Sequence, residues 1–356
     1  MGNLDRIETV ADIQRGVVMG ADNWADFGSV VIKRSSELLL FNYATAAQFA
    51  GVWTPFERMS RGLIVRTDGE IVARPFDKFF NWLEGGMRGT GHIVTVTEKI
   101  DGSLGILYRS DGYKFATRGS FDSEQALWAT DFLNRHYDLR SLPDEWTLLF
   151  EIVYPGNRVV VDYGDVEALY LLAIRNRFTG DYLPFWPDVY EAAQAFGFPL
   201  PNVFTFNRIE DILAATGQID ASREGWVVEM SDGTRWKFKG DRYRELHKLV
   251  TGLSFKVVLT ACSEQRGAAL LNQIPVEFQG QCADWVEEIE TTVARALDEI
   301  ERAYSSAPKG ERKEFALWVM NEHKAIAPYL FARHDNKDVR GLVYRGAFRD
   351  RAVESE

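Results

Sequence analysis

The chain has 356 residues, 46% of them hydrophobic and 13% aromatic, so it can bury a large core, and its length favours two domains. The net charge of -11 argues against a generally basic surface and against indiscriminate nucleic-acid binding. No apolar run approaches the roughly 20 residues that span a bilayer, and the amino terminus is polar. We therefore expect a cytoplasmic protein without a membrane partner. The two cysteines are too few for a disulfide framework and lack the spacing of a zinc site.

Strand-like segments dominate the first two-thirds of the chain. Asp68-Gly69 and Asp111-Gly112 are each flanked by β-forming residues, which is typical of hairpins, so we predict antiparallel sheet and not a doubly wound fold. Amphipathic helices are predicted over residues 123–136 and 188–196. The predicted strands cover residues 30–33, 38–43, 63–66, 71–74, 94–99, 106–109, 113–117, 146–153, 158–162, 168–175, 225–230 and 234–239.

After Gly240 the pattern changes to helical periodicity. Helices are predicted near residues 241–253, 283–304 and 309–323, which places a domain boundary close to residue 250. The segment 309–351 is rich in Lys and Arg and is one candidate partner surface. A solvated face of mixed charge explains this segment equally well.

The most informative motif surrounds Lys99, which stands at a strand end and is followed by Asp101-Gly102. Covalent nucleotidyl transfer needs a nucleophilic lysine in this kind of setting. A lysine with the reference pKa of about 10.4 is protonated at neutral pH, so it reacts only if nearby cations or a metal lower its pKa. We therefore expect positive charge near Lys99. The full motif reads Thr97-Glu98-Lys99-Ile100-Asp101-Gly102-Ser103.

A second motif supplies cations. Period-two geometry puts Arg235, Lys237 and Lys239 on one face of a strand, with Trp236 and Phe238 on the other. If the apolar face packs in the core, the lysines point into the cleft that the sheet lines, where they can hold a phosphate and lower the pKa of a neighbouring lysine. The alternative is an ordinary half-buried strand with exposed lysines.

Two isolated acids, Glu151 and Glu224, lie in otherwise apolar strands. A buried carboxylate without a partner is unfavourable by several kcal/mol, so each acid is a candidate for hydrated magnesium, ribose hydroxyls or a structural salt bridge to an arginine. Arg61 opens a hairpin that Lys78 follows, and both could reach triphosphate oxygens or be structural cations. Arg118 lies between a predicted strand and a predicted helix. This segment could hold a phosphate or a ribose through its backbone N–H groups and the arginine, and a plain turn explains it equally well.

The order of these motifs is more specific than any one of them, and it resembles that of the covalent nucleotidyltransferases, the ligases and capping enzymes. Within that superfamily, residues 43–247 resemble the ATP-dependent RNA ligase 1 family of bacteriophage type. The narrower match rests on Arg61-Gly62, Arg74-Pro75, Lys78-Phe79-Phe80-Asn81, Arg118-Gly119-Ser120, Ser123-Glu124-Gln125-Ala126, Phe150-Glu151, Asn157-Arg158, Arg175-Asn176 and Thr179-Gly180.

The resemblance implies an α+β fold: an antiparallel-sheet, ATP-grasp-like nucleotidyltransferase domain in residues 1–250, followed by an all-helical domain in residues 251–356 that recognises RNA ends. It implies that Lys99 takes AMP from ATP, while Asp101, Glu151 and Glu224 orient it or hold the waters around Mg²⁺, with Mn²⁺ as an alternative. The other implied nucleotide contacts are Lys237 and Lys239 at the α-phosphate, Arg61 and Lys78 at the outer phosphates, and Glu98, Gly102, Arg118, Ile174 and Tyr243.

Two of these positions depart from the family pattern. Arg118 stands where the family has lysine, and Ile174 stands where several relatives stack an aromatic ring on adenine.

The resulting prediction is an ATP-dependent RNA ligase that joins 5′-phosphate and 3′-hydroxyl RNA ends through lysyl-AMP and RNA-adenylate, in RNA repair such as that of tRNA. We expect a monomer, and an end-healing kinase or phosphatase is a candidate partner. The alternatives are a DNA ligase or GTP-dependent capping enzyme of the same superfamily, or a non-catalytic, nucleotide-responsive RNA-binding protein. A DNA ligase normally appends a β-barrel after the lysine pair, whereas the pattern of this chain after Gly240 is helical.

Overall fold

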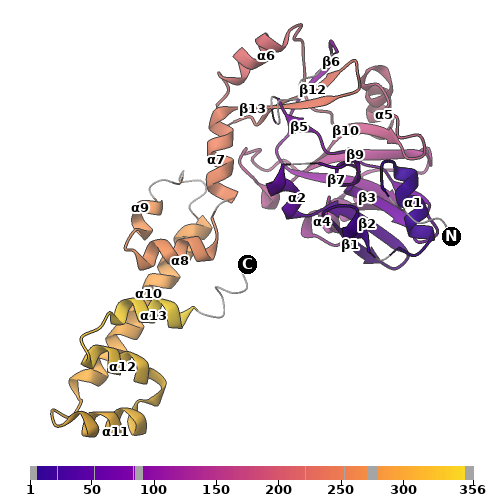
Figure 1. The fold of residues 1–356 in the computed structure, drawn as a ribbon. Coiled ribbons are helices and arrows are strands. Elements are labelled where there is room, and N and C mark those ends of the chain that lie inside the picture. The colour runs from indigo at the N-terminus through magenta and orange to yellow at the C-terminus, as the bar shows by residue number, and fades with distance from the viewer. Residues whose placement is uncertain are drawn as a thin grey trace. The chain divides into compact units, whose positions relative to one another are not determined.

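The structure, a computed structural model, describes residues 6–21, 23–51, 53–82, 84, 91–220, 222–251, 253–271, 274 and 280–348. The chain divides into two compact units, Met1–Glu245 and Leu246–Glu356. The first unit combines sheets with helices, and the described part of the second is helical (Figure 1), so the predicted α+β class is confirmed. Within the described part of the chain, no helix is both long and apolar enough to cross a bilayer.

Three sheets build the first unit. Their described strands pair antiparallel, except that β13 and β5 run parallel. The first sheet has the order β1 (Val30–Ser35), β2 (Leu38–Tyr43), β3 (Arg61–Arg66), β4 (Ile71–Ala73). The second is β10 (Ala168–Asn176), β9 (Trp146–Val153), β7 (Ser103–Arg109), β8 (Tyr113–Ala116), and the third is β11 (Val203–Phe204), β6 (Ile93–Glu98), β12 (Gly225–Met230), β13 (Arg235–Lys239), β5 (Phe80–Asn81).

The first two sheets pack face to face, because Leu40 and Ile64 of the first share a core with Ile106 and Leu149 of the second. The helices α4 (Glu124–His136) and α5 (Tyr190–Phe196) cover the other face of the second sheet. The capping residue Ser123, whose hydroxyl accepts from the Ala126 N–H, starts α4 as the sequence predicts. The remaining helices of this unit are α1 (Val10–Val18), α2 (Thr45–Ala50), α3 (Pro55–Met59) and α6 (Ile209–Thr216).

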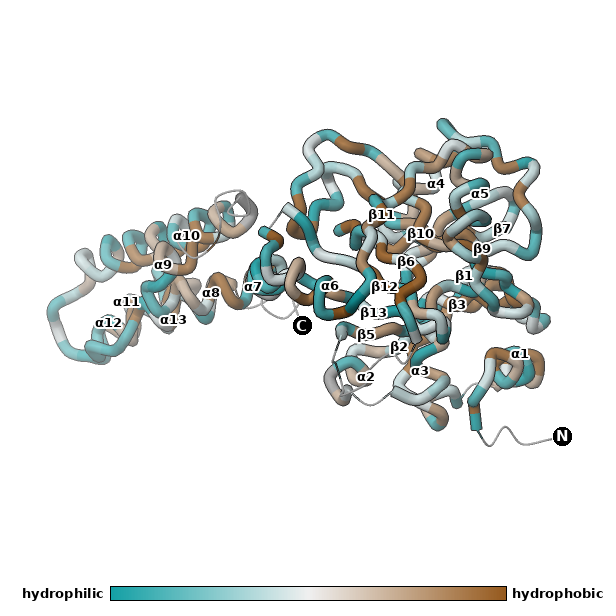
Figure 2. Tube along the Cα trace, turned by 90° about the horizontal axis from the view of Figure 1, so that it is seen from above, coloured by the Kyte–Doolittle hydropathy of each residue, from teal (hydrophilic) through white to brown (hydrophobic). Residues whose placement is uncertain are grey.

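The second unit has its own core. The long helix α10 (Gly280–Ser305) buries Ile289, Val293 and Ile300 at helical spacing, and in Figure 2 hydrophobic and hydrophilic segments alternate along it. Cys262 and Cys282 are buried free thiols. Around α10 lie α8 (Phe255–Ser263), α9 (Gly267–Leu271), α11 (Arg312–Glu322), α12 (Ala327–His334) and α13 (Val339–Ala347), while α7 (Asp241–Thr251) leads into this unit.

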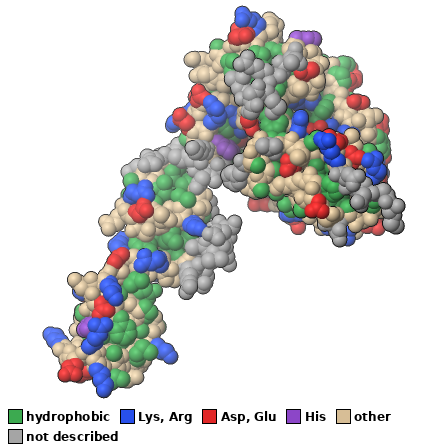
Figure 3. Space-filling view, viewed as in Figure 1, with side chains coloured by type: hydrophobic (Ala, Val, Ile, Leu, Met, Phe, Trp, Pro, Cys, Tyr) green, Lys and Arg blue, Asp and Glu red, His purple; other side chains and the backbone are tan. Residues whose placement is uncertain are grey.

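The basic segment of the second unit contains several internal ion pairs. Arg312, Arg333 and Arg340 pair with Asp335, Glu301 and Glu290 at 2.9–3.0 Å. On the face seen in Figure 3, Lys and Arg side chains of this unit are spread among acidic and apolar ones. These observations favour the mixed-charge explanation for the cations named here. Residues 349–351 of the predicted surface lie outside the described residues.

One predicted strand is wrong. Residues 158–162 follow a short 3-10 turn, Pro155–Asn157, and form no strand. The reason is tertiary, since the backbone N–H groups of Val160 and Val161 both donate to the Asp101 carboxylate at 2.8 Å and are unavailable to a sheet.

Candidate active site

Three neighbouring strands of the third sheet converge on Lys99. Lys99 follows β6, Glu224 precedes β12, and Lys239 ends β13. The register sets Gly225 opposite Lys239, and the Lys99 N–H donates to the Gly225 carbonyl at 2.9 Å. Gly225 has φ +145°, and a Cβ there would lie 1.8 Å from the Phe238 carbonyl oxygen, so the approach of β12 to β13 requires glycine.

Glu224 bridges the two lysines. Its Oε2 lies 2.6 Å from Lys99 Nζ and its Oε1 lies 2.8 Å from Lys239 Nζ, and its side chain is 2% exposed. Burial alone would raise the pKa of Glu224, but the two ammonium groups hold it below its ordinary value. The salt bridge that the sequence left open is therefore present, although its partners are lysines and not an arginine.

The electrostatic setting of Lys99 differs from the one we expected. Burial lowers the pKa of Lys99, but the carboxylates of Glu224 and Glu151 outweigh that effect and raise the pKa above its ordinary value. Without nucleotide or metal, the structure therefore favours the protonated ammonium, which is not a nucleophile. Activation requires that the negative charge of these carboxylates be compensated.

Asp101 is held entirely by the protein. Its Oδ2 accepts from the Val160 and Val161 N–H groups at 2.8 Å, and its Oδ1 accepts from the Tyr243 hydroxyl at 2.7 Å. The Asp101 N–H donates to the Tyr163 hydroxyl at 2.9 Å. These contacts fix the backbone next to Lys99, which supports the first of the two roles predicted for Asp101, that of orienting Lys99.

Glu151 has a strongly perturbed titration. Burial, opposed by Lys99 and reinforced by Glu224, raises the pKa of Glu151 to about 7. Its Oε1 accepts from the Gly102 N–H at 3.1 Å. A Cβ on Gly102 would lie 2.4 Å from the Ile152 carbonyl oxygen, so the close approach expected at this glycine is to β9.

A cluster of cations lies beside these acids. Lys237 projects from the face of β13 opposite the buried Trp236 and Phe238, as predicted. Burial and then the positive charges of Arg61 and neighbouring lysines hold the pKa of Lys237 well below its ordinary value. Uncompensated positive charge of this kind favours binding of an anion.

Arg61 and Lys78 complete this cluster. Arg61 Nη1 is buried and, within the described residues, has no hydrogen-bond partner. The Phe79 ring lies 4.3 Å from Lys237 Nζ and 5.7 Å from the Arg61 guanidinium carbon. Lys78 Nζ lies 4.8 Å from the Trp53 ring, and burial lowers the pKa of Lys78. The cations predicted for the outer phosphates are therefore close to Lys237.

Arg118 joins the same surface through Tyr43. Its Nη1 donates to the Tyr43 hydroxyl at 2.5 Å, and its guanidinium carbon lies 4.7 Å from the Tyr43 ring. Lys78 Nζ lies 5.6 Å from that ring. The arginine that replaces the family lysine thus contributes its charge close to the predicted phosphate site.

Ile174 does not belong to the site. Period-two alternation puts Tyr170 and Ile174 on one face of β10, but the register shifts between Leu171 and Ala173. Ile174 therefore faces the core beneath α4 and α5, where it is 0% exposed. The sequence analysis missed Tyr170, which is directly opposite Glu151 and only partly buried.

Glu98 occupies the rim of the site. Its Oε2 accepts from Asn202 Nδ2 at 2.6 Å, and its Oε1 lies 3.4 Å from Arg223 Nε. The negative charge of Glu98 also reaches Tyr170, whose pKa is raised first by burial and then by this carboxylate. Glu98 and Tyr170 therefore delimit one side of the candidate nucleotide site.

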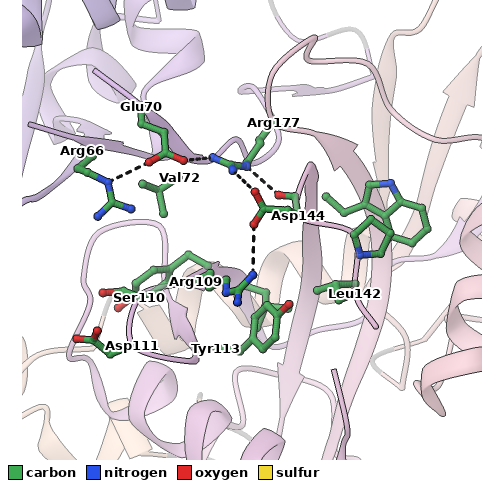
Figure 4. A pocket seen from close by; sticks show the side chains of 14 residues that line it. Arg66, Glu70, Val72, Arg109, Ser110, Asp111, Tyr113, Leu142, Asp144 and Arg177 are labelled. Atoms are coloured by element: carbon green, nitrogen blue, oxygen red, sulfur yellow. Dashed lines mark hydrogen bonds and ion pairs between the residues drawn. The ribbon is translucent and has the colours of Figure 1, made fainter. Parts of the chain in front are cut away.

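A separate pocket of about 300 Å³ lies at the far end of β7 (Figure 4). Its charges are matched internally, since the buried Arg177 bridges Glu70 at 2.8 Å and Asp144 at 2.7 Å. Arg109 in this pocket ends β7, a strand about 20 Å long whose other end, Ser103, is the one that follows the Lys99 motif. Because its cations are already paired, this pocket lacks the positive excess of the Lys99 site.

Among the described residues, no group of three or more potential side-chain ligands is placed to hold a metal directly. A lysine at a strand end, the buried Glu224, the partly buried Glu151 and a cluster of cations nevertheless form one site on a mostly antiparallel scaffold. Covalent nucleotidyl transfer needs a lysine beside carboxylates and cations, and this site brings those groups together.

The sequence model of a family described as RNA ligase matches residues 59–243, which is more than half of the chain. The chain belongs to this RNA ligase family, and the predicted family is confirmed. The matched segment includes every residue singled out at the site except Tyr43 and Trp53.

Three relatives carry names of the same kind. The chain is 30% identical over 311 residues to RNA ligase 1 of Bacteriophage TS2126, covering 78% of this chain and 71% of that protein. It is 24% identical over 396 residues to an RNA ligase of Rhodothermus phage RM378, covering 87% of each. It is 29% identical over 266 residues to a putative bifunctional polynucleotide kinase/RNA ligase of Autographa californica nuclear polyhedrosis virus. That alignment covers 64% of this chain but spans only 36% of the viral protein's length.

Proposed function

We propose that the protein seals RNA ends by three nucleotidyl transfers. First, Lys99 Nζ attacks the α-phosphorus of ATP, so that a phosphorus–nitrogen bond forms and pyrophosphate leaves. AMP then passes to the 5′-phosphate of RNA, and finally a 3′-hydroxyl attacks that activated end and releases AMP. The observation that carries this proposal is that Lys99 lies 2.6 Å from the buried Glu224 carboxylate, and that its positive charge and those of Arg61, Lys78 and Lys239 all act on Lys237.

The cation cluster supplies the triphosphate site in this proposal. Lys237 and Lys239 contact the α-phosphate, where negative charge accumulates during transfer, and Arg61 and Lys78 contact the outer phosphates. The support is that Lys237 carries a strongly lowered pKa among like charges, and that Arg61 Nη1 is buried without a partner among the described residues. Phosphate oxygens would satisfy both groups.

The carboxylates suit magnesium held through water. Glu151 and Glu224 offer oxygen donors, the ligand type that Mg²⁺ prefers, and Mn²⁺ accepts the same donors. When bound there, the metal supplies positive charge that favours ionised Glu151 and lowers the pKa of Lys99. Glu224 meanwhile holds the Lys99 side chain in place at 2.6 Å.

The nucleoside of ATP lies against the second sheet in this proposal. Tyr170 presents an aromatic ring on the Glu151 face and is available to contact the base, in place of Ile174. Asp101 and Tyr243 keep the backbone around Lys99 fixed through their 2.7 Å hydrogen bond.

We further propose that the helical second unit selects the RNA ends, and that the natural role is repair of broken RNA such as a tRNA loop. Sealing needs a 5′-phosphate and a 3′-hydroxyl. Breaks that leave other end groups therefore need an end-healing activity first, and the viral relative's name joins a polynucleotide kinase to an RNA ligase.

The test is a sealing assay with matched substrates. Wild-type protein receives RNA or DNA oligonucleotides that carry either a 5′-phosphate or a 5′-hydroxyl, with ATP or GTP and Mg²⁺. The proposal predicts joining of 5′-phosphorylated RNA with ATP, and no joining of the 5′-hydroxyl RNA. Joining of DNA alone would indicate DNA repair, covalent labelling by GTP would indicate capping, and RNA binding without chemistry would indicate the non-catalytic alternative.

A further inference from the structure

The segment between β4 and β5 carries part of the cation cluster without regular secondary structure. Residues 74–79 are neither helix nor strand, yet they place Lys78 beside Trp53 and Phe79 beneath Lys237 and Arg61. The positions of these side chains therefore depend on what anchors the segment.

Arg175 of β10 is that anchor. Its side chain is 4% exposed, and its Nη1 donates to the Pro75 carbonyl at 2.5 Å and to Asp77 Oδ1 at 3.0 Å, while its Nη2 donates to Asp77 Oδ2 at 3.2 Å. From the other side, its Nε donates to the Gly180 carbonyl at 2.7 Å. The planar Arg175 guanidinium thus holds residues 74–79 in place by hydrogen bonds to one of their backbone carbonyls and to the Asp77 side chain.

The turn after β10 holds this guanidinium in place. Asn176 Oδ1 accepts from the N–H groups of Phe178 and Thr179 at 2.9 and 3.1 Å, which shapes the turn. Gly180 has φ +86°, and a Cβ there would lie 2.3 Å from the Arg74 guanidinium carbon. Arg175-Asn176 and Thr179-Gly180, which carry the family resemblance but have no part in the proposed chemistry, therefore build the anchor.

We propose that Arg175 is a positioning residue that holds Lys78 and Phe79 in place for the outer phosphates of ATP, and that it therefore acts on the first step of the reaction and not on the last. This inference rests on the proposed function. ATP carries two outer phosphates and pyrophosphate is made of the same two, whereas RNA-adenylate carries only the RNA 5′-phosphate beyond the AMP phosphate and has no terminal phosphate for Lys78 to contact. Sealing of pre-adenylated RNA therefore does not use the contact between Lys78 and a terminal phosphate.

The test separates these partial reactions in the full-length protein. Arg175→Lys keeps the charge but loses the fork that reaches Pro75 and Asp77 together. We expect the KM for ATP in lysyl-AMP formation, and for pyrophosphate in its reversal, to rise about 10- to 100-fold. Sealing of pre-adenylated RNA should stay within about twofold of wild type, which a merely structural role would not produce.

Arg177→Lys is the matched control, because Arg177 is also buried and lies two residues further on, but it bridges Glu70 and Asp144 in the distant pocket of Figure 4. Its KM for ATP should not change. Asp77→Asn, at a partly exposed carboxylate, carries the same test if Arg175→Lys does not fold.

Equal losses in both partial reactions, or an unchanged KM for ATP in a folded variant, would overturn the inference. A wild-type protein that forms no lysyl-AMP would overturn the proposed function, and this inference with it.

Discussion

Burial and nearby carboxylates have opposite effects on the pKa of Lys99, and their balance keeps Lys99 protonated in the nucleotide-free site. Burial favours its neutral amine, but Glu224 and Glu151 favour the ammonium and prevail. The Glu224 carboxylate, which holds the proposed nucleophile Lys99 at 2.6 Å, therefore also keeps it protonated. Positive charge that arrives with the metal relieves this suppression in the proposed reaction, so activation is coupled to cofactor binding.

The titration of Glu151 predicts a pH-dependent stability. Its pKa is about 7 in the folded protein against an ordinary 4.5, so the folded chain binds more protons between these values. The free energy of unfolding should therefore fall as pH rises from 4.5 to 7. Glu151→Gln removes the group that titrates, so its free energy of unfolding should not fall in this way. The free energy of unfolding of Glu151→Gln, measured relative to that of wild type, should therefore rise by about 2–3 kcal/mol between about pH 5 and pH 8. Urea unfolding of nucleotide-free protein measures it; an advantage independent of pH would contradict the assignment.

Replacing Lys237 should stabilise the nucleotide-free protein and weaken its binding of phosphates. Its surroundings disfavour the ammonium, so Lys237→Met should stabilise the nucleotide-free protein by about 1 kcal/mol or more, which is about 2–4 °C in Tm. The same change should abolish stabilisation by added pyrophosphate. Thermal unfolding with and without pyrophosphate measures both effects. Lys33→Met, at an exposed lysine, is the control and should leave both unchanged. A destabilised Lys237→Met that still responds to pyrophosphate would count against the phosphate site.

At the scale of elements, strand ends assemble the site. Local signals predicted most strands, because hairpins such as those at Asp68-Gly69 and Asp111-Gly112 are specified by short-range turn chemistry, and both turns contain glycine at positive φ. Long-range effects were not predictable. The backbone N–H groups of Val160 and Val161 bind the Asp101 carboxylate and therefore cannot pair in a sheet. The bulge in β10 turns the Ile174 side chain toward the core and leaves that of Tyr170 on the Glu151 face.

The hairpin of β12 and β13 supports a prediction at this scale. Gly225→Ala places a Cβ against the Phe238 carbonyl in a backbone conformation that side chains disfavour, which should cost about 2–4 kcal/mol and displace Glu224 from Lys99. Gly233→Ala, in the turn at the other end of the same hairpin, meets no atom within 4 Å and should cost about 1 kcal/mol. Denaturant unfolding compares the two variants. Equal costs would show that the close contact at Gly225 does not limit stability.

At the scale of the whole molecule, the cores are separate. The core of the second unit draws on residues 255–348, whereas the cores of the first unit end at residue 238. The net charge of -11 is compatible with a nucleotide site because the cations gather locally in the first unit. Composition alone could not reveal this gathering, which depends on the order of strands in the third sheet.

Separate cores predict separable activities. A chain truncated after residue 251 retains α7 and every site residue, so it should form lysyl-AMP at a rate close to that of the full-length protein. RNA sealing should fall more than about tenfold, because the proposed end-selecting unit is absent. Gel assays of the two reactions compare the truncated and full-length chains. Undiminished sealing would remove the second unit from substrate recognition.

The central claim is that Lys99 becomes covalently linked to AMP, and intact-protein mass spectrometry after incubation with ATP and Mg²⁺ tests it most directly. The account predicts a mass increase of one AMP on wild-type protein, reversal by pyrophosphate, and no increase on Lys99→Ala. An unmodified wild-type protein, or an adduct that persists in Lys99→Ala, would contradict it.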